Sequence, residues 1–213
     1  MEERISNYEI TKRRVQGDFL KYDQEKMIKK FSLKHDEEYL YIRFIGHPYR
    51  INRENGYLEW SEDEFAACTE GDFNEALTIY DLLCDSKDGC RASGDYINLQ
   101  SLSMLQSSSK KLGDGLFGGK EKIFDHKEEL LSRVCERLGG TNAGKGDVAY
   151  EIPLFDFLPC RIQFWNSDEE FDAQLQIFMD KNILDFIRYE TVWYAVGHLI
   201  KRLTEEMKKI ESK

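Results

Sequence analysis

The carboxyl-terminal part of the chain carries its most constraining pattern, a run of apolar residues separated by four or three positions. The members are Tyr189, Trp193, Val196, Ile200, Leu203, Met207 and Ile210. In an α helix this spacing puts all of them on one face. The pattern therefore predicts a helix over 189–210 whose apolar face is buried against a sheet or another helix.

Other parts of the chain show a period of two, which is typical of strands. Apolar residues alternate over 38–45, and Asn55-Gly56 favours a type I′ hairpin after it. The first group of predicted strands is 38–45, 49–52 and 57–60. The later strands are 96–99, 148–154, 159–165 and 173–179. We expect an antiparallel meander followed by later hairpins.

Helices are predicted between these groups of strands. Besides the closing helix, we expect one long amphipathic helix over the first thirty residues, where Tyr8, Val15, Phe19 and Tyr22 form one apolar stripe. Two more helices are predicted over 73–84 and 122–138. A mostly antiparallel sheet packed by about four helices is an α+β fold, and we expect one domain over 1–213. The serine- and glycine-rich stretch 101–120 is expected to be a mobile loop unless a ligand orders it.

The net charge of −10 is concentrated in one segment. Residues 54–95 contain 12 acidic and two basic side chains, whereas the rest of the chain holds 28 of each. One explanation is helix capping, because Ser61-x-x-Glu64 and Asp72-x-x-Glu75 both fit the capping-box pattern. The alternative is a docking face for a basic protein partner, or a weak calcium site. Such a charge repels phosphate backbones, so no nucleic-acid partner is expected.

Composition and cysteine usage favour a cytoplasmic protein without a membrane segment. Mean hydropathy is −0.59, and no apolar run approaches the roughly 18 residues of a membrane span. Residues 1–20 contain no apolar core of a secretory signal. The five cysteines have no spacing typical of a zinc or iron–sulfur site, so reduced thiols and no metal are predicted.

Two glycine-rich loops nearly match nucleotide-binding motifs. Gly113 to Gly118 fits G-x-G-x-x-G but follows a polar loop instead of a strand. Gly139 to Lys145 resembles a P-loop, but Gly146 stands where the magnesium-binding Ser or Thr belongs. No motif supports a nucleotide or metal, and the cofactor is left unknown. What remains is an anion-binding hypothesis on Lys120, Lys145 and Gly144, against flexible connectors.

Candidates for acid–base chemistry are scattered along the chain. Asp147 and Asp156 lie at predicted strand ends, as does Asp180. On the closing helix Glu190, Tyr194 and His198 are four residues apart, and thus share a face. These side chains either line a pocket or form the polar flank of an amphipathic helix.

Several segments of the carboxyl-terminal half resemble an uncharacterised prokaryotic family, domain of unknown function 3786. They are Gly139-Gly140…Gly146-Asp147, Pro153-Leu-Phe-Asp-Phe-Leu-Pro159, Gln163-Phe-Trp165…Asp168-Glu169-Glu170-Phe171, Phe178-Met-Asp180 and Tyr189-Glu190-Thr191…Gly197-His198-Leu199. The resemblance is strongest over 76–203 and implies no activity. It suggests that the Gly94-Asp95 corner, the strand-end aspartates and Glu190 lie close together.

Two functions stay open from the sequence. The preferred one is a non-enzymatic accessory or binding module that recognises a ligand or protein partner through the acidic segment 54–95 and the mobile loops. The alternative is a small-molecule enzyme with a pocket of Asp147, Asp156, Glu190 and His198. Exposed aromatic side chains beside an acidic surface, with Trp60 and Trp165 as candidates, would favour the binding module.

Overall fold

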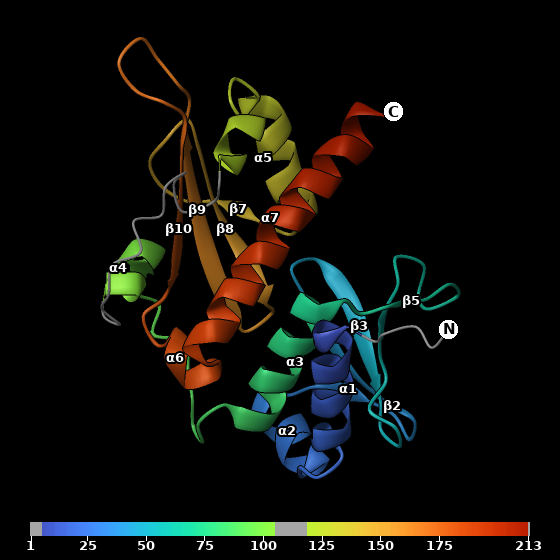
Figure 1. Ribbon diagram of the computed structural model, residues 1–213. Helices are drawn as coiled ribbons and strands as arrows, with labels where there is room; N and C mark the ends of the chain where they lie inside the picture. The colour runs from blue at the N-terminus through green and yellow to red at the C-terminus, as the bar shows by residue number, and fades with distance from the viewer. Residues whose placement is uncertain (1–5, 105–118, 213) are drawn as a thin grey trace. The chain divides into compact units, whose positions relative to one another are not determined.

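The computed structural model of the chain describes residues 6–104 and 119–212 (Figure 1). It divides into two compact units, each assembled from two stretches of sequence. Unit 1 comprises residues 1–91 and 182–199, and unit 2 comprises residues 92–181 and 200–213. The α+β class is confirmed, since each unit combines helices with an antiparallel sheet. A single domain over 1–213 stays a prediction.

Unit 1 contains a meander of four strands with a short fifth strand beside it. The strands are β1 (Lys34–His35), β2 (Tyr39–Phe44), β3 (His47–Asn52), β4 (Leu58–Trp60) and β5 (Thr69–Glu70). Their order is β5-β4-β3-β2, with β1 on β2. Ile42 pairs with Tyr49 across β2 and β3, and alternate residues of both strands are buried. The predicted period of two thus sets the face of this sheet that packs in the core.

The helices of unit 1 are α1 (Asn7–Phe19), α2 (Gln24–Phe31), α3 (Phe73–Asp85), α6 (Ile183–Phe186) and the first part of α7 (Tyr189–Glu211). The single helix predicted for the first thirty residues is wrong. Helix α1 ends at Phe19, and Asp23 begins α2 by accepting a hydrogen bond from the Lys26 amide. That N-cap is a stronger local signal than the continuous apolar stripe.

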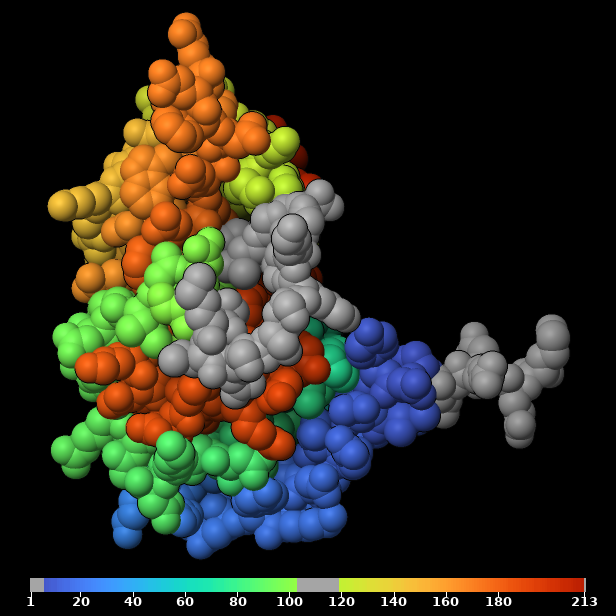
Figure 2. Space-filling view, turned by 60° about the vertical axis from the view of Figure 1, so that its left-hand side comes forward, coloured from blue at the N-terminus to red at the C-terminus, as the bar shows by residue number. Residues whose placement is uncertain are grey.

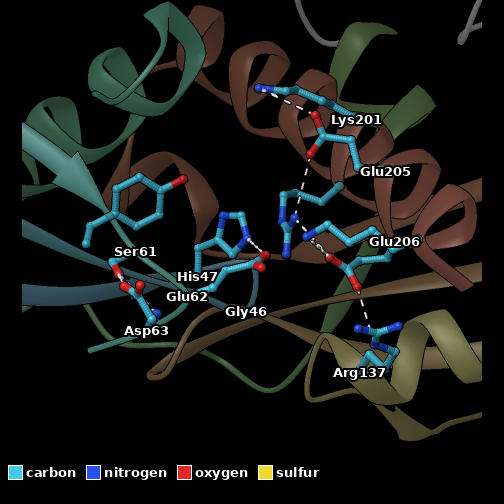
Figure 3. Close-up of polar contacts among 12 residues, drawn as sticks. Gly46, His47, Ser61, Glu62, Asp63, Arg137, Lys201, Glu205 and Glu206 are labelled. Atoms are coloured by element: carbon cyan, nitrogen blue, oxygen red, sulfur yellow. Dashed lines mark hydrogen bonds and ion pairs between the residues drawn. The ribbon is translucent and has the colours of Figure 1, made fainter. Parts of the chain in front are cut away.

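Two turn predictions in unit 1 also need correction. The β3–β4 connection spans five residues, 53–57, and only Gly56 in it has a positive φ, of 70°. It is therefore not a type I′ turn, which needs two such residues. Ser61 caps no helix: its hydroxyl accepts from the amides of Asp63 and Phe65 in a tight turn. Figure 3 shows the Ser61 and Asp63 side chains in that turn.

Unit 2 is built on the hairpins predicted for the second half of the chain. Its strands are β6 (Tyr96–Asn98), β7 (Thr141–Asn142), β8 (Val148–Phe155), β9 (Leu158–Trp165) and β10 (Gln174–Asp180). Their order is β8-β9-β10-β6, with β7 on β8. The inward residues of β9, such as Ile162 and Phe164, are fully buried. The β9–β10 connection extends beyond the sheet (orange in Figure 1).

The helices of unit 2 are α4 (Leu99–Met104), the 3-10 helix η1 (Lys120–Ile123), α5 (Glu128–Arg137) and the last part of α7. The helix predicted over 122–138 begins six residues late. His126 interrupts it with a φ of 54°, and its amide donates to Asn166 Oδ1 at 2.6 Å. The start of the predicted loop 101–120 is helical, and residues 105–118, with the Gly113–Gly118 motif, lie outside the described residues.

The described residues contain seven α helices, whereas about four were predicted. The three additional helices, α2, α4 and α6, are short. The closing helix is confirmed within one residue of its predicted end. None of the helices in the described part of the chain has the length and apolar character needed to cross a membrane.

Candidate functional site

An open cleft in unit 2 lies where β9 ends and β10 begins. Its volume is about 440 Å³. We call it the Trp165 cleft. Its walls are Asp147, Trp165, Asn166, Ser167, Asp168, Phe171, Asp172, Gln174 and Gln176. In Figure 2 the orange surface of this segment protrudes at the edge of unit 2.

The two aromatic walls come from one hairpin. Trp165 is the last residue of β9 and is half-buried. Gly146 lies against its ring, since a Cβ added to that glycine would be 3.5 Å from Trp165 Cε2. Phe171 is 61% exposed. A turn presents it to solvent, because Asp168 Oδ1 accepts from the amides of Glu170 and Phe171, each at 2.8 Å. An exposed phenylalanine at this position is available to a ligand.

Hydrogen bonds hold the base of this connection. Asp147 Oδ2 accepts from the Asn166 amide at 2.8 Å. Asp125 accepts from the Ser167 amide at 2.8 Å and from its hydroxyl at 2.6 Å. These bonds from Ser167 are the main reason that the pKa of Asp125 is lowered. The cleft is thus supported on both sides, although it is formed by a loop.

All of the charged side chains that line the Trp165 cleft are acidic. Asp147, Asp168 and Asp172 line it, and no lysine or arginine does. Within residues 6–104 and 119–212, no ion pair joins these three carboxylates to a basic side chain. Aromatic rings next to carboxylates attract a positively charged group, through the ring quadrupole and through direct charge interaction.

Unit 1 contains a cleft of about 550 Å³ between α1, α3 and the start of α7. We call it the Arg188 cleft. Its charges are paired internally: Arg188 binds Asp81 and Asp85, and Tyr22 donates to Asp85. Burial, followed by the Asp85 and Asp81 carboxylates, raises the pKa of the Cys84 thiol to about 12. The polar groups of this cleft therefore hold its helices together.

Glu190, Tyr194 and His198 of the closing helix do not line one common pocket. Glu190 and Tyr194 line the Arg188 cleft, where Tyr194 meets Phe73 edge to face at 5.2 Å. His198 is fully buried. Its ring stacks on Phe44 at 4.8 Å, its Nε2 lies 3.4 Å from Tyr49 Oη, and its Nδ1 lies 3.4 Å from Glu75 Oε1.

The strand-end aspartates are not neighbours. Asp147 precedes β8 and Asp156 follows it, so they lie roughly 25–30 Å apart at the rise of a strand. The expected proximity of these two residues is wrong. Asp180 does meet the Gly94 corner: its fully buried carboxylate accepts from the Gly94 amide at 3.0 Å and from the Ser93 amide at 2.9 Å. The glycine–aspartate corner is thus a structural contact in unit 2.

The anion-site candidates are all in unit 2. Lys120 begins η1, Lys145 lies between β7 and β8, and both side chains are exposed. Gly144 and Gly146 have φ values of 122° and 124°. A Cβ on Gly146 would lie 2.9 Å from the Phe164 carbonyl oxygen. These glycines therefore let the loop approach β9, and the anion-binding role stays a prediction.

The acidic segment 54–95 is largely used inside unit 1. The predicted Asp72–Glu75 capping box is confirmed, with both reciprocal bonds present. Glu75 and Asp81 are buried, Glu59 pairs with Arg50, and Glu62 lies 3.2 Å from His47 Nε2 (Figure 3). The capping explanation accounts for part of this charge, and a partner surface here stays a prediction.

The Trp165 cleft is not among the sites predicted from the sequence. The signal was available, because a tryptophan, a phenylalanine and two aspartates fall within eight residues of one predicted hairpin. The contact of Glu75 with His198 had no such signal, since 122 residues separate them. Only the tertiary fold brings that pair together.

Comparison with known proteins gives one family and no characterised relative. No curated protein and no solved structure matches the chain. A family model described as a domain of unknown function, DUF3786, matches residues 23–202. That range includes nearly all of the elements described above, from α2 to the middle of α7. The chain therefore belongs to the family of the domain of unknown function DUF3786.

Proposed function

We propose that this chain is a binding module whose Trp165 cleft takes a lysine or arginine side chain of a protein partner. The observation that carries the proposal is the composition of the cleft: two aromatic walls and three aspartates, with no basic residue lining it. A cation over an aromatic face contributes about 0.5–1 kcal/mol at exposed sites and about 2 kcal/mol when desolvated. Carboxylates nearby add direct attraction.

The position of the cleft supports a side chain of a partner as its occupant. The β9–β10 connection extends beyond the sheet of unit 2 (Figure 1), and Phe171 is exposed at it. Glu169 and Glu170, next to Phe171 in this connection, are also exposed. An extended basic segment can therefore reach the cleft and meet further acidic residues along the same loop.

The enzyme alternative has less support. An acid–base group must reach the substrate, whereas His198 is fully buried. Asp147 and Asp156, proposed for the same pocket, lie at opposite ends of β8. The acidic segment 54–95 has less support as a partner surface, because several of its carboxylates cap helices or pair within unit 1.

The test is titration of the full chain with a labelled peptide in which lysine alternates with glycine, followed by fluorescence anisotropy. Matched peptides carry arginine, acetyl-lysine or glutamate in place of lysine. We expect binding of the lysine and arginine peptides and at least a tenfold loss with acetyl-lysine, which keeps the stem but removes the charge. Affinity should fall as salt rises.

Two pairs of variants locate the site. Trp165→Ala should weaken peptide binding by roughly tenfold or more, whereas Trp60→Ala, in unit 1, should leave it unchanged. Asp172→Asn should weaken binding several-fold, whereas Asp156→Asn, an exposed aspartate at the other end of β8, should not. Equal binding of the acetylated peptide, or an unchanged affinity of Trp165→Ala, would refute the proposal.

A further inference from the structure

A second group of side chains, in unit 1, has the chemistry of a metal site. We propose that Asp72, Glu75 and His198 bind a divalent transition-metal ion, with zinc the best fit. Each of the three offers one donor atom, and these atoms all lie within 4.8 Å of one another. Two carboxylate oxygens and one imidazole nitrogen form a donor set that zinc and similar ions accept.

The separation of the two buried donors suits a shared ion. His198 Nδ1 and Glu75 Oε1 are 3.4 Å apart, longer than the roughly 2.7–2.9 Å of a strong charge-assisted hydrogen bond. Two ligands that each lie about 2.1 Å from a tetrahedral zinc are roughly 3.4 Å apart. The observed distance therefore corresponds to one edge of a zinc tetrahedron.

The backbone of α3 holds the two carboxylates in position. Asp72 is the N-cap, and its Oδ1 accepts from the Glu75 amide at 3.0 Å. Glu75 Oε2 accepts from the Asp72 amide at 2.6 Å. The capping box thus uses one oxygen of each carboxylate, and it is the other Glu75 oxygen that lies towards His198. Both carboxylates are oriented without help from a ligand.

The imidazole is held equally well from its other side. Tyr49 Oη lies 3.4 Å from His198 Nε2, and Tyr49 is fully buried. The Phe44 ring stacks on the imidazole at an interplanar angle of 16°. A metal-binding histidine usually donates its second ring N–H to a nearby oxygen, which leaves the first nitrogen for the metal. Tyr49 Oη has the position of that oxygen.

The cluster is reachable from solvent on one side. Asp72 is half-buried, whereas Glu75 and His198 are 2% and 0% exposed. A water molecule on the Asp72 side would complete four-coordination. An ion here would join the amino terminus of α3 to α7 within unit 1, and would stabilise that unit by binding only the folded chain.

The test uses the full chain, purified without chelators, for metal analysis by mass spectrometry and for titration with Zn²⁺ and Co²⁺. We expect one equivalent of zinc per chain, and a rise in the unfolding temperature of roughly 5–10 °C at a hundredfold excess over Kd. The cobalt-loaded protein should show d–d absorption without thiolate-to-cobalt charge transfer, which excludes binding by the cysteines.

Variants then assign the ligands. His198→Gln should weaken zinc binding by at least roughly 100-fold, and Tyr49→Phe by about tenfold, because it removes the oxygen that orients the imidazole. His126→Gln is the matched control, since the His126 side chain is 68% exposed, and should bind zinc like the unchanged chain. If His198→Gln does not fold, Glu75→Gln and Tyr49→Phe give the same reading.

Two results would overturn the proposal. One is the absence of stoichiometric zinc binding by the unchanged chain. The other is equal zinc affinity of the unchanged chain and the folded ligand variants. Peptide binding at the Trp165 cleft is measured separately in unit 2, so either proposal can fail while the other stands.

Discussion

The Asp81 carboxylate accepts hydrogen bonds from both the backbone amide and the guanidinium of Arg188. Asp81 Oδ2 accepts from the Arg188 amide at 2.7 Å, and Oδ1 accepts from the guanidinium Nε at 2.6 Å. The Asp81 side chain is 3% exposed. A carboxylate of α3 therefore satisfies an amide just before α7 and holds its charge partner at the same time.

Asp81→Ala should destabilise the chain by roughly 1–3 kcal/mol, because it removes the acceptor of the Arg188 amide and one of the two carboxylates that bind the guanidinium. Asp88→Ala removes an exposed partner of Lys26 and should cost much less, because ion pairs in solvent contribute little to stability. Urea unfolding of both variants measures the difference. Equal losses would show that Asp81 contributes only as a surface charge.

The buried carboxylate of Asp180 makes a similar prediction for unit 2. It accepts from the amides of Ser93 and Gly94 and from the Ser93 hydroxyl. Asp180→Asn places an amide group against these donors and should cost roughly 2–3 kcal/mol. Asp95→Asn, on an exposed neighbour, serves as the control in thermal unfolding. A small loss for Asp180→Asn would mean that the corner adapts to the amide.

Gly56 should not tolerate a side chain. Its φ is 70°, and an added Cβ would lie 2.6 Å from the Gln16 carbonyl oxygen. We expect Gly56→Ala to cost roughly 2 kcal/mol or more. Gly17→Ala is the opposite case: nothing lies within 4 Å of its Cβ, and alanine in a helix interior should gain about 0.5–1 kcal/mol.

Chemical denaturation of these two glycine variants should therefore move the unfolding midpoint in opposite directions. Equal shifts of the same sign would contradict the packing of Gly56 against α1. Tyr80→Phe tests the same junction independently, because the Tyr80 hydroxyl donates to the Gly56 carbonyl oxygen. The loss of this hydrogen bond should destabilise the chain by about 1 kcal/mol.

The stability of unit 2 should depend on the ionisation of Glu206. Burial would raise its pKa, but the hydrogen bond from Lys209 and the charges of Arg202 and Arg137 outweigh it, so the pKa is lowered below the ordinary 4.5. A lowered carboxylate pKa stabilises the fold above the unfolded value, and this contribution is lost as pH falls through the folded one.

Glu206→Gln should accordingly destabilise the chain at pH 7, and the difference should shrink as pH falls below 4.5. Urea midpoints of both chains across that range provide the measurement. A difference that does not change with pH would assign the effect of Glu206 to packing instead of charge. Figure 3 shows Glu206 beside Arg137, 3.3 Å from its Nε.

The thiols should differ in reactivity with a disulfide reagent. Cys68 is exposed. Burial raises the pKa of Cys84 and of Cys160 to about 12, so these thiols carry little thiolate near neutral pH. We expect Cys68 to react first in the folded chain, and all five cysteines to react in guanidinium. Early labelling of Cys160 would indicate local opening of β9.

Periodicity predicted the elements that are long and amphipathic. Helices α3 and α7 and strands β8 to β10 are confirmed close to their predicted bounds, because one buried face dictates their pattern. Where a local bond ends an element, periodicity misleads. Asp23 divides the amino-terminal helix, and His126 shortens α5, through contacts that an apolar stripe does not register.

The two candidate sites also differ in how far the sequence alone could predict them. The Trp165 cleft is largely local, since Trp165 and Phe171 belong to one hairpin, and the sequence contained enough to anticipate it. The zinc ligands are not local: Glu75 and His198 meet only because α3 and α7 pack in unit 1. No spacing rule connects residues that are joined by packing alone.

The division of unit 1 into two stretches has a consequence for synthesis. Its core includes Val192, Val196 and Leu199 of α7, which the ribosome adds only after all of residues 92–181. At about 5–20 residues per second, the meander and α3 wait roughly 5–20 s for their last helix. During that interval the nascent chain exposes the apolar surface that α7 later covers. A chaperone would bind this surface in that interval.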